Sequence, residues 1–222
     1  MGGLRAPTIA NGIRTISERT SFRSIGELVD FGRVTCSGLV RPMQERGEIA
    51  DLLELVRERD CHRIVELGTA RGGTLFYFCR VASPDATIVT VDRDCSCSPG
   101  DDGLSHDDLF RAFALPGQTV RAVNGPFHQD ETFARVRDAV ADVPVDFLFI
   151  DGDHSYTGVK ADFERYSTLV RPGGLIALHD IVPSHKDGVE PFWREIKDRY
   201  RTSEFIHRPE KSWGGIGVIF VD

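Results

Sequence analysis

The sequence predicts a doubly wound α/β domain with a seven-stranded, mostly parallel sheet that ends in an antiparallel hairpin. Short β-branched runs alternate with amphipathic helical stretches, which is typical of a parallel sheet with helical crossovers. The 222 residues, 41% hydrophobic and 27% charged, suffice for one such domain with a substantial core. Two apolar runs near the C-terminus, Phe205–His207 and Ile216–Val221, are close enough in sequence to form the hairpin.

The remaining elements follow in order along the chain. A first helix is expected over Met43–Arg59, because apolar residues such as Ile49 and Leu53 fall on one stripe at helical spacing. Turn-forming residues predict a loop at Pro99–Ser105, and Pro172-Gly173-Gly174 is expected to break the chain before the fifth strand. The expected strands are His62–Leu67, Ala86–Val91, Thr119–Val123, Val145–Ile150 and Leu175–Leu178, and the other expected helices are Gly72–Val81, His106–Phe113, Glu131–Ala141, Tyr156–Val170 and Pro191–Tyr200.

Residues 1–42 precede the main domain, which spans residues 43–222. The first segment is too short for a core of its own. It nevertheless carries apolar side chains that need burial, namely Ile13, Ile16, Phe22, Ile25, Leu28, Val29 and Phe31. We therefore expect it to act as a lid or as a contact between the subunits of a homo-oligomer.

Composition and charge argue against several classes of partner. The net charge of −7 offers no basic face for nucleic acid. No apolar run approaches the length of a membrane span, and the N-terminus has no apolar export signal. The five cysteines are accordingly expected to be reduced thiols in the cytoplasm, and Cys95-Ser96-Cys97 is interpreted as an ordinary loop rather than a metal site.

A glycine-rich turn between the first strand and the next helix is the strongest ligand-binding signal. Gly68 and the Gly72-Gly73 pair, with Thr69 between them, let the backbone approach a ligand that a Cβ atom would exclude. Their G-x-x-x-G-G spacing differs from the G-x-G-x-x-G of a pyrophosphate binder. Glu66, just before the turn, is a candidate acceptor for a ligand ammonium group, directly or through water.

Two further signals follow the second and third strands. Asp92, with Arg93 beside it, lies about twenty residues after the glycines, where a carboxylate accepts hydrogen bonds from ribose hydroxyls. Gly125-Pro126 predicts a tight turn that packs against an adenine edge. Each feature alone has a structural explanation as a helix start, a strand-end cap or a turn. Because all three lie at the carboxyl ends of successive strands, where open α/β sheets bind ligands, we interpret them as one cofactor site.

Several motifs together resemble class I S-adenosylmethionine (SAM)-dependent methyltransferases. They are Glu66-Leu67-Gly68 with Gly72-Gly73, the segment Phe149–Tyr156, Pro172-Gly173-Gly174 and His179-Asp180-Ile181. The sequence is most similar to the small-molecule O-methyltransferase branch that includes macrocin O-methyltransferase and cephalosporin hydroxylase relatives. The resemblance covers roughly residues 43–221.

The resemblance implies a Rossmann-like fold, SAM as the cofactor, and methyl transfer to a hydroxyl group of a small molecule. A second interpretation is a hydroxylase component or a binding protein that transfers no methyl group. A third is a nicotinamide-dependent oxidoreductase, although the glycine spacing and the C-terminal hairpin argue against it.

Asp151 and Asp180 end the fourth and fifth predicted strands, which are expected to be neighbours. Two carboxylates at adjacent strand ends repel each other unless they are hydrogen-bonded, protonated or share a cation. Oxygen ligands suit Mg²⁺ or another divalent cation, and the resemblance implies such a cation, which also binds the acceptor hydroxyl. Ile181 cannot ligate, so His179 is the candidate third ligand; alternatively, His179 points into the core. Asp151 also counts among the candidate cofactor contacts.

His154 is the favoured general base, because an imidazole accepts a proton near neutral pH. The resemblance supports this position, which carries a lysine base in catechol O-methyltransferase. It also supports Asp153, at the position of the base in the sugar-modifying branch. A helix-capping or packing role for His154 stays open, and His128 and His185 are weaker candidates.

Acceptor selectivity is expected from the N-terminal segment and from the loops at residues 95–105 and 182–190. Trp193 and Trp213 are interpreted as core or hairpin packing rather than as surfaces for acceptor stacking.

Overall fold

The computed structural model describes residues 14–34, 41–93, 106–182 and 188–222. The predicted loop at Pro99–Ser105, the Cys95–Cys97 pair, Ile13 and His185 lie outside these ranges. Within them, no helix combines the length and the apolar character needed to cross a membrane.

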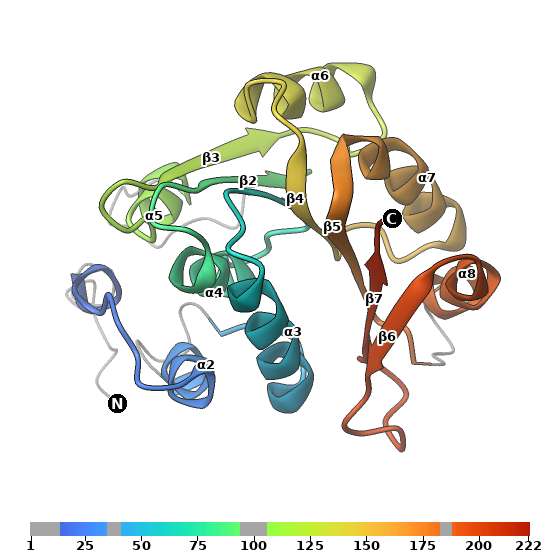
Figure 1. Ribbon diagram of the computed structural model, residues 1–222, viewed down its shortest axis with the longest axis horizontal. Coiled ribbons are helices and arrows are strands. Elements are labelled where there is room, and N and C mark those ends of the chain that lie inside the picture. The colour runs from blue at the N-terminus through green and yellow to red at the C-terminus, as the bar shows by residue number, and fades with distance from the viewer. Residues whose placement is uncertain (1–13, 35–40, 94–105, 183–187) are drawn as a thin grey trace, which may run out of the picture.

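Seven strands form one sheet in the order β3-β2-β1-β4-β5-β7-β6, which confirms the predicted fold class (Figure 1). The five strands from β3 to β5 in this order run parallel, and β7 pairs antiparallel with both β5 and β6. The strands are β1 (Arg63–Leu67), β2 (Thr87–Asp92), β3 (Thr119–Asn124), β4 (Val145–Ile150), β5 (Val170–His179), β6 (Arg201–Phe205) and β7 (Ile216–Phe220).

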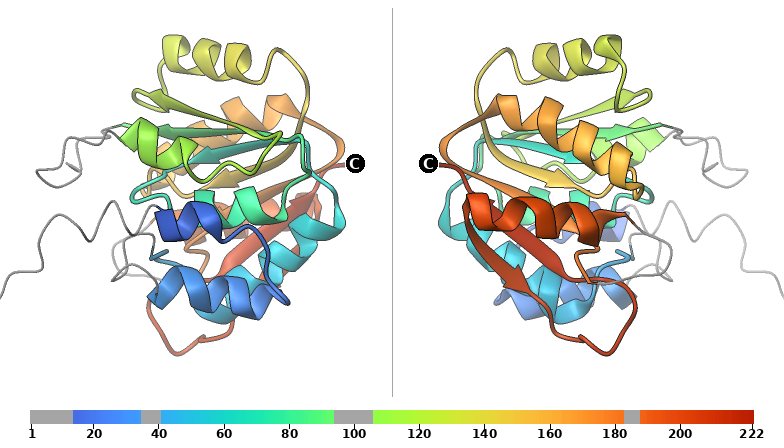
Figure 2. Two further views of the ribbon diagram at one scale, coloured as in Figure 1. Left: turned by 90° about the vertical axis from the view of Figure 1, so that its left-hand side faces the viewer. Right: turned by 90° about the vertical axis from the view of Figure 1, so that its right-hand side faces the viewer.

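Helices cover both faces of the sheet and give three layers (Figure 2). The helices α2 to α5 contribute to the core on one face, and α6 to α8 contribute to the core on the other. Along β4, Phe147 and Phe149 enter the first core, whereas Leu148 and Ile150 enter the second. The helices are α2 (Ile25–Val34), α3 (Arg46–Glu58), α4 (Gly73–Val81), α5 (His106–Arg111), α6 (Asp130–Ala139), α7 (Tyr156–Tyr166) and α8 (Val189–Ile196), with 3-10 turns at Ser167–Leu169 and Lys197–Arg199.

The C-terminal hairpin is confirmed, but its first strand begins earlier than predicted. The sequence predicted a helix up to Tyr200 and a strand at Phe205–His207, whereas α8 ends at Ile196 and β6 begins at Arg201. β6 is an edge strand in which no residue is fully buried. Its polar residues therefore gave no apolar pattern by which the strand could be recognised.

Strand β5 begins at Val170, ahead of the predicted start at Leu175. Pro172-Gly173-Gly174 lies inside the strand, where the pairing register with β4 shifts. Gly173 N donates a hydrogen bond to Val221 O at 2.7 Å, and Val221 N donates to Gly174 O at 3.0 Å. Proline is tolerated in a strand at such an irregularity, so this motif bends the strand rather than ending it.

Residues 14–34 pack against the main domain. Ile16, Leu28 and Val29 are buried in the core that α3 and α4 share. The Tyr77 hydroxyl of α4 donates a hydrogen bond to Val29 O at 2.8 Å. Gly32 lies against the Tyr77 ring, where an added Cβ would come within 2.5 Å of it. This part of the N-terminal segment thus belongs to the domain core, and its role as a lid or subunit contact stays a prediction.

We expect Leu28→Ala to lower the free energy of unfolding by about 2–5 kcal/mol, the usual range for a buried leucine, because Leu28 is 2% exposed. Urea unfolding followed by circular dichroism measures this change. Val34→Ala, at the 75% exposed end of the same helix, is the matched control and should change stability by less than about 0.5 kcal/mol. Equal stability of the two variants would contradict the packing of α2 into the core.

Candidate functional site

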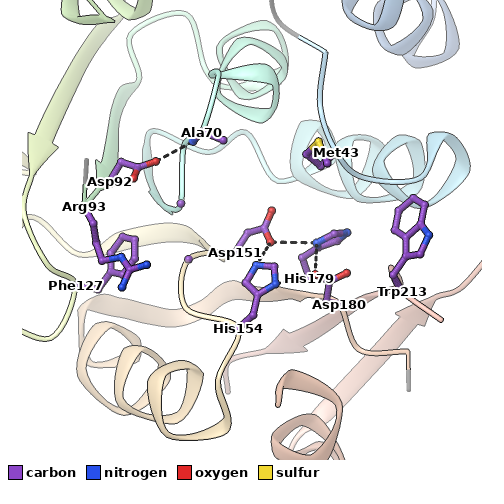
Figure 3. A pocket seen from close by; sticks show the side chains of 12 residues that line it. Met43, Ala70, Asp92, Arg93, Phe127, Asp151, His154, His179, Asp180 and Trp213 are labelled. Carbon is purple, nitrogen blue, oxygen red and sulfur yellow. Dashed lines mark hydrogen bonds and ion pairs between the residues drawn. The ribbon is translucent and has the colours of Figure 1, made fainter. Parts of the chain in front are cut away.

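A cavity of about 440 Å³ opens at the carboxyl ends of the parallel strands (Figure 3). Asp92, Arg93 and Phe127 lie at one end of it, and Met43 and Trp213 lie at the other. Between these ends are Asp151, His154, His179 and Asp180. A second cavity of about 870 Å³ adjoins the first, and the two share the lining residues Met43, Gly68, Ala70, Asp151 and Trp213.

Gly68 brings the loop after β1 against the loop after β4. Its φ is +91°, and an added Cβ would lie 2.0 Å from Asp151 O. Gly68 N donates a hydrogen bond to Val91 O at 2.9 Å, and Asp151 N donates to Leu67 O at 2.8 Å. Glycine is required here because the Asp151 backbone approaches so closely. Gly68 also lines both cavities.

Asp92 at the end of β2 holds the glycine-rich loop. Its Oδ2 accepts hydrogen bonds from Thr69 N at 3.1 Å and from Ala70 N at 2.9 Å. Ala70 has a φ of +46°, a left-handed conformation that is uncommon for a residue other than glycine. Asp92 and Arg93 line the first cavity and Thr69 lines the second, so the predicted ribose-binding carboxylate also fixes the loop beside it.

The paired glycines have separate roles. Gly72 is the N-cap of α4 with a φ of +79°, and a Cβ there would meet the Phe110 ring at 2.7 Å. Gly72 thus packs against α5, and its contact with a ligand stays a prediction. Gly73 lines the second cavity.

Glu66 is fully buried and lines neither cavity. Thr74 and Thr90 both donate hydrogen bonds to its carboxylate, the latter at 2.7 Å. Burial, more than any neighbouring charge, raises the pKa of Glu66 to about 7. The carboxylate is enclosed between β1, β2 and α4, and its contact with a ligand ammonium, directly or through water, stays a prediction.

The turn after β3 contributes a different residue from those predicted. Gly125 N donates a hydrogen bond to Asp92 O at 3.0 Å, so Gly125 joins the ends of β2 and β3. Neither Gly125 nor Pro126 lines a described cavity, whereas the 2% exposed Phe127 lines the first. The turn therefore places an aromatic ring, rather than its own backbone, at the predicted adenine end.

Four side chains form a charged cluster at the ends of β4 and β5. His179 Nδ1 lies 3.1 Å from Asp151 Oδ1 and 3.4 Å from Asp180 Oδ2. His154 lies on the cavity side, with Nε2 3.4 Å from Asp151 Oδ1 and Nδ1 3.2 Å from Asp180 Oδ2. The structure thus brings together the predicted base and all three predicted metal ligands.

The opposite charges of the carboxylates and the imidazoles determine which groups of this cluster are protonated. Burial opposes ionisation of Asp151, but His179 and His154 outweigh burial and lower the pKa of Asp151 to about 2. Burial likewise disfavours the charged form of His179, but the two carboxylates outweigh it and raise the pKa of His179 to about 10. The pKa of Asp180 is lowered by His179 in spite of burial. Two ionised carboxylates are therefore balanced by a protonated His179.

The orientation of the Asp180 side chain is set by its own backbone conformation and by the loop between β6 and β7. Its φ of +63° is left-handed, which turns the chain sharply after His179. Gly214 N, in the loop between β6 and β7, donates a hydrogen bond to Asp180 Oδ1 at 2.9 Å. Glu48 of α3 holds the same loop by accepting hydrogen bonds from Gly215 N at 2.8 Å and His207 N at 3.1 Å.

Asp153, the second candidate base, does not line either cavity. Its Oδ1 accepts hydrogen bonds from Ser155 N at 2.9 Å and Ser155 Oγ at 2.7 Å. Its Oδ2 lies 3.3 Å from His128 Nε2, and His128 Nδ1 lies 3.1 Å from Asp162 Oδ1. Burial raises the pKa of Asp162 to about 7. Asp153 and His128 thus form a structural network at the start of α7.

Sequence reasoning missed three residues of the site. Gln44, 3% exposed, donates a hydrogen bond from Nε2 to Asp151 Oδ2 at 2.6 Å. Met43 lines both cavities from the same segment. Trp213, which was interpreted as packing, is 41% exposed and also lines both, whereas Trp193 is core as predicted. These contacts join positions far apart in the chain, so a local sequence pattern could not predict them.

Residues 65–181 match the family model described as a methyltransferase domain. This span is more than half of the chain, so the chain belongs to that family of methyltransferase domains. The predicted methyltransferase family and the Rossmann-like fold are thereby confirmed.

Two curated relatives are much longer than the region they share with the chain. The uncharacterised protein y4gI of Sinorhizobium fredii is 34% identical over 163 residues, which are 71% of this chain and 17% of that protein. An uncharacterised protein of Acanthamoeba polyphaga mimivirus is 29% identical over 123 residues, which are 55% of this chain and 53% of that protein.

Solved structures share the fold over nearly the whole chain. An O-methyltransferase from Bacillus cereus, in complex with S-adenosylhomocysteine (SAH), has a TM-score of 0.60 and 20% identity, covering 96% of this chain and 99% of its own. The O-methyltransferase TomG from Streptomyces achromogenes, involved in tomaymycin synthesis and in complex with SAM, has a TM-score of 0.56 and 18% identity, covering 96% of each chain. A TDP-rhamnose 3'-O-methyltransferase of calicheamicin biosynthesis has a TM-score of 0.56 and 16% identity, covering 98% of this chain and 96% of its own.

We expect Gly68→Ala to destabilise the protein and to weaken SAH binding, because the new Cβ would collide with the Asp151 carbonyl. Gly173→Ala is the matched control, since Gly173 has a φ of +79° and only the Arg171 guanidinium, 3.1 Å away, near its Cβ position. The control should carry the strain of a left-handed residue alone, about 1–2 kcal/mol. Thermal unfolding and calorimetry with SAH compare the two variants. A Gly68→Ala protein as stable as the control would refute the steric role.

Proposed function

We propose that this protein transfers the methyl group of SAM to a hydroxyl group of a small molecule. The observation that carries the proposal is that one cavity contains both the predicted ribose-binding Asp92 and the charged cluster of Asp151, His154, His179 and Asp180. The choice of a hydroxyl acceptor is supported by the neighbours of the same fold that are named O-methyltransferases.

In this proposal the donor extends from the Asp92 end of the first cavity into the second cavity. Its ribose binds Asp92, as carboxylates at this position do in related folds, and its adenine packs against Phe127. Gly68 and Ala70 line both cavities, so these residues and Asp151 would contact the middle of the donor. The amino-acid end then lies beside Gln44, Thr69 and Gly73, which line the second cavity.

Gln44 is the proposed acceptor for the donor ammonium, the role that the sequence suggested for Glu66. The ionised Asp151 only accepts, so Gln44 must present its NH₂ group to Asp151 Oδ2, at 2.6 Å. The amide oxygen of Gln44 is buried and has no hydrogen-bond partner among the described residues. An unpaired buried acceptor costs about 1–3 kcal/mol, and an ammonium group would satisfy it.

The reaction needs an oriented acceptor and a place for its proton. The acceptor oxygen attacks the methyl carbon in line as the carbon–sulfur bond breaks, and SAH leaves as a neutral thioether. Because the sulfonium is already reactive, the protein contributes mainly orientation and exclusion of water. His154 lines the cavity with a 42% exposed side chain, and its imidazole is the proposed base for the hydroxyl proton.

The same cluster fits a divalent cation. One donor atom each from Asp151, His154 and Asp180 lies within 4.8 Å of the others. The distances of 3.4 Å to Asp151 and 3.2 Å to Asp180 start from different ring nitrogens of His154, Nε2 and Nδ1. Adjacent ligands of a six-coordinate Mg²⁺ or Mn²⁺ are about 3 Å apart, given metal–ligand distances of 2.0–2.2 Å. The two carboxylates, Asp151 and Asp180, suit Mg²⁺ or Mn²⁺. They would hold the cation while His154 stays unligated as the base, because an imidazole that binds a metal through one nitrogen carries a proton on the other and cannot accept a second. When bound, such a cation would lower the pKa of the acceptor hydroxyl.

We expect Asp151→Asn and Asp180→Asn each to abolish Mn²⁺ binding, measured by electron paramagnetic resonance, while the affinity for SAH changes little. In a radiolabelled SAM assay with a panel of hydroxylated acceptors, both variants should lose nearly all activity. His154→Ala should lose activity by a factor on the order of 10²–10⁴. A chelator should act like the aspartate variants, and added Mg²⁺ or Mn²⁺ should reverse its effect.

Asp153→Asn is the matched control, because Asp153 pairs with Ser155 and His128 outside the cavities. It should keep wild-type activity within a few-fold. Full wild-type activity in excess chelator would refute the role of the cation and leave His154 as a metal-free base. SAH binding without methyl transfer to any hydroxylated acceptor would favour the hydroxylase-component or binding interpretation instead.

We expect Gln44→Leu to weaken SAH binding about 10- to 100-fold, equivalent to about 1.4–2.8 kcal/mol. The affinity for 5'-methylthioadenosine, which lacks the amino-acid group, should stay unchanged. Calorimetry with both ligands measures the difference, and Met43→Leu in the adjacent position is the control. Equal weakening of both ligands would assign Gln44 to positioning of Asp151 alone.

A further inference from the structure

The second cavity has a cluster of positive side chains that the proposed methyl transfer leaves without a role. We call this cluster the cationic wall, and it consists of the lining residues Arg33, Arg41, Arg71 and Lys211. They come from four separate places: the end of α2, the segment before α3, the loop after β1 and the loop between β6 and β7. Among the described residues lining this cavity, Asp151 is the one carboxylate. The wall is therefore strongly positive in a chain whose net charge is −7.

No carboxylate in the part of the chain that the structure describes pairs with the cationic wall. Within the described ranges, none of its four side chains lies at ion-pair distance from a carboxylate. Two of them are nevertheless held in place. Arg33 Nη1 donates a hydrogen bond to Gln44 O at 2.9 Å, and the Lys211 ammonium lies 4.5 Å from the centre of the Trp213 ring. Neither contact removes the positive charge, which stays available to a ligand.

The methyl donor cannot account for four cations. SAM carries one carboxylate, together with one ammonium and one sulfonium group, so the donor as a whole is positive. One guanidinium suffices to bind the carboxylate through two parallel hydrogen bonds. The other cations of the wall would repel the donor rather than attract it. Their presence calls for a second ligand that carries several negative charges.

We propose that the methyl acceptor bears a phosphate or diphosphate group that binds the cationic wall while its hydroxyl group lies beside Asp151 and Asp180. The inference rests on the proposed function, because it assigns the acceptor of that same site. The two cavities share Met43 and Trp213, so one molecule can extend from the wall to the charged cluster. The charge of a diphosphate matches the cations that the donor leaves unpaired, and guanidinium groups pair well with phosphate oxygens.

Calorimetric titration of inorganic pyrophosphate into SAH-saturated protein tests this assignment. Wild-type protein should bind pyrophosphate, and the double variant Arg41→Gln/Lys211→Gln should bind it at least tenfold more weakly. These two positions spare Arg33, which contacts Gln44, and Arg71 in the glycine-rich loop. The matched control Arg111→Gln/Arg121→Gln removes two exposed charges from α5 and β3, outside both cavities. It should bind pyrophosphate as the wild type does.

Each alternative outcome overturns a defined part of the proposal. Unchanged pyrophosphate binding by the double variant would remove the wall as the binding site. Pyrophosphate binding that SAH abolishes would assign the wall to the donor carboxylate. Malonate binding as tight as that of pyrophosphate would identify a carboxylate-bearing acceptor instead of a phosphorylated one. By contrast, a wild-type protein that fails to bind SAH would contradict the proposed function itself.

Discussion

Two carboxylates, Asp151 and Asp180, end adjacent parallel strands, and their mutual repulsion is the constraint that the surrounding structure has to meet. His179 contacts both of them with one ring nitrogen, Gly214 N binds Asp180, and the Gln44 amide binds Asp151. These partners come from β5, from the loop between β6 and β7, and from the segment before α3. Stabilising one pair of negative charges therefore fixes the relative positions of segments far apart in the chain.

The beginning of α3 organises the side of the site that carries the charged cluster, and the end of β2 organises the side that carries the glycine-rich loop. Within one turn, Gln44 reaches Asp151 and Glu48 holds the backbone of the loop that presents Trp213 and Lys211. On the other side, Asp92 fixes the backbone of the glycine-rich loop. These two sets of hydrogen bonds have no residue in common, and Gly68 joins the two sides where it lies against the Asp151 backbone.

The sequence predicted those parts of the protein in which burial produces a regular pattern. Strands β1, β2 and β4 lie close to their predicted bounds because their apolar runs are buried, whereas the polar edge strand β6 lacked such a run. The gathering of Asp151, His154, His179 and Asp180 followed from strand order alone. The sequence did not predict the orientation of the Glu66 and Asp153 side chains. Nearby threonine and serine hydroxyl groups donate hydrogen bonds to these two carboxylates and thereby orient them. The positions of Gln44 and Trp213 in the site depend on tertiary contacts, which the local spacing of residues in the sequence does not predict.

Strand β7 lies between β5 and β6, although it is the last of the seven strands to leave the ribosome. A nascent chain that ends before β7 therefore has an open edge on β5 and a β6 segment without its pairing partner. It also lacks Gly214, the backbone donor to Asp180. Completion of the sheet and assembly of the charged cluster should coincide, so that the nascent chain becomes competent for its reaction in a single late step.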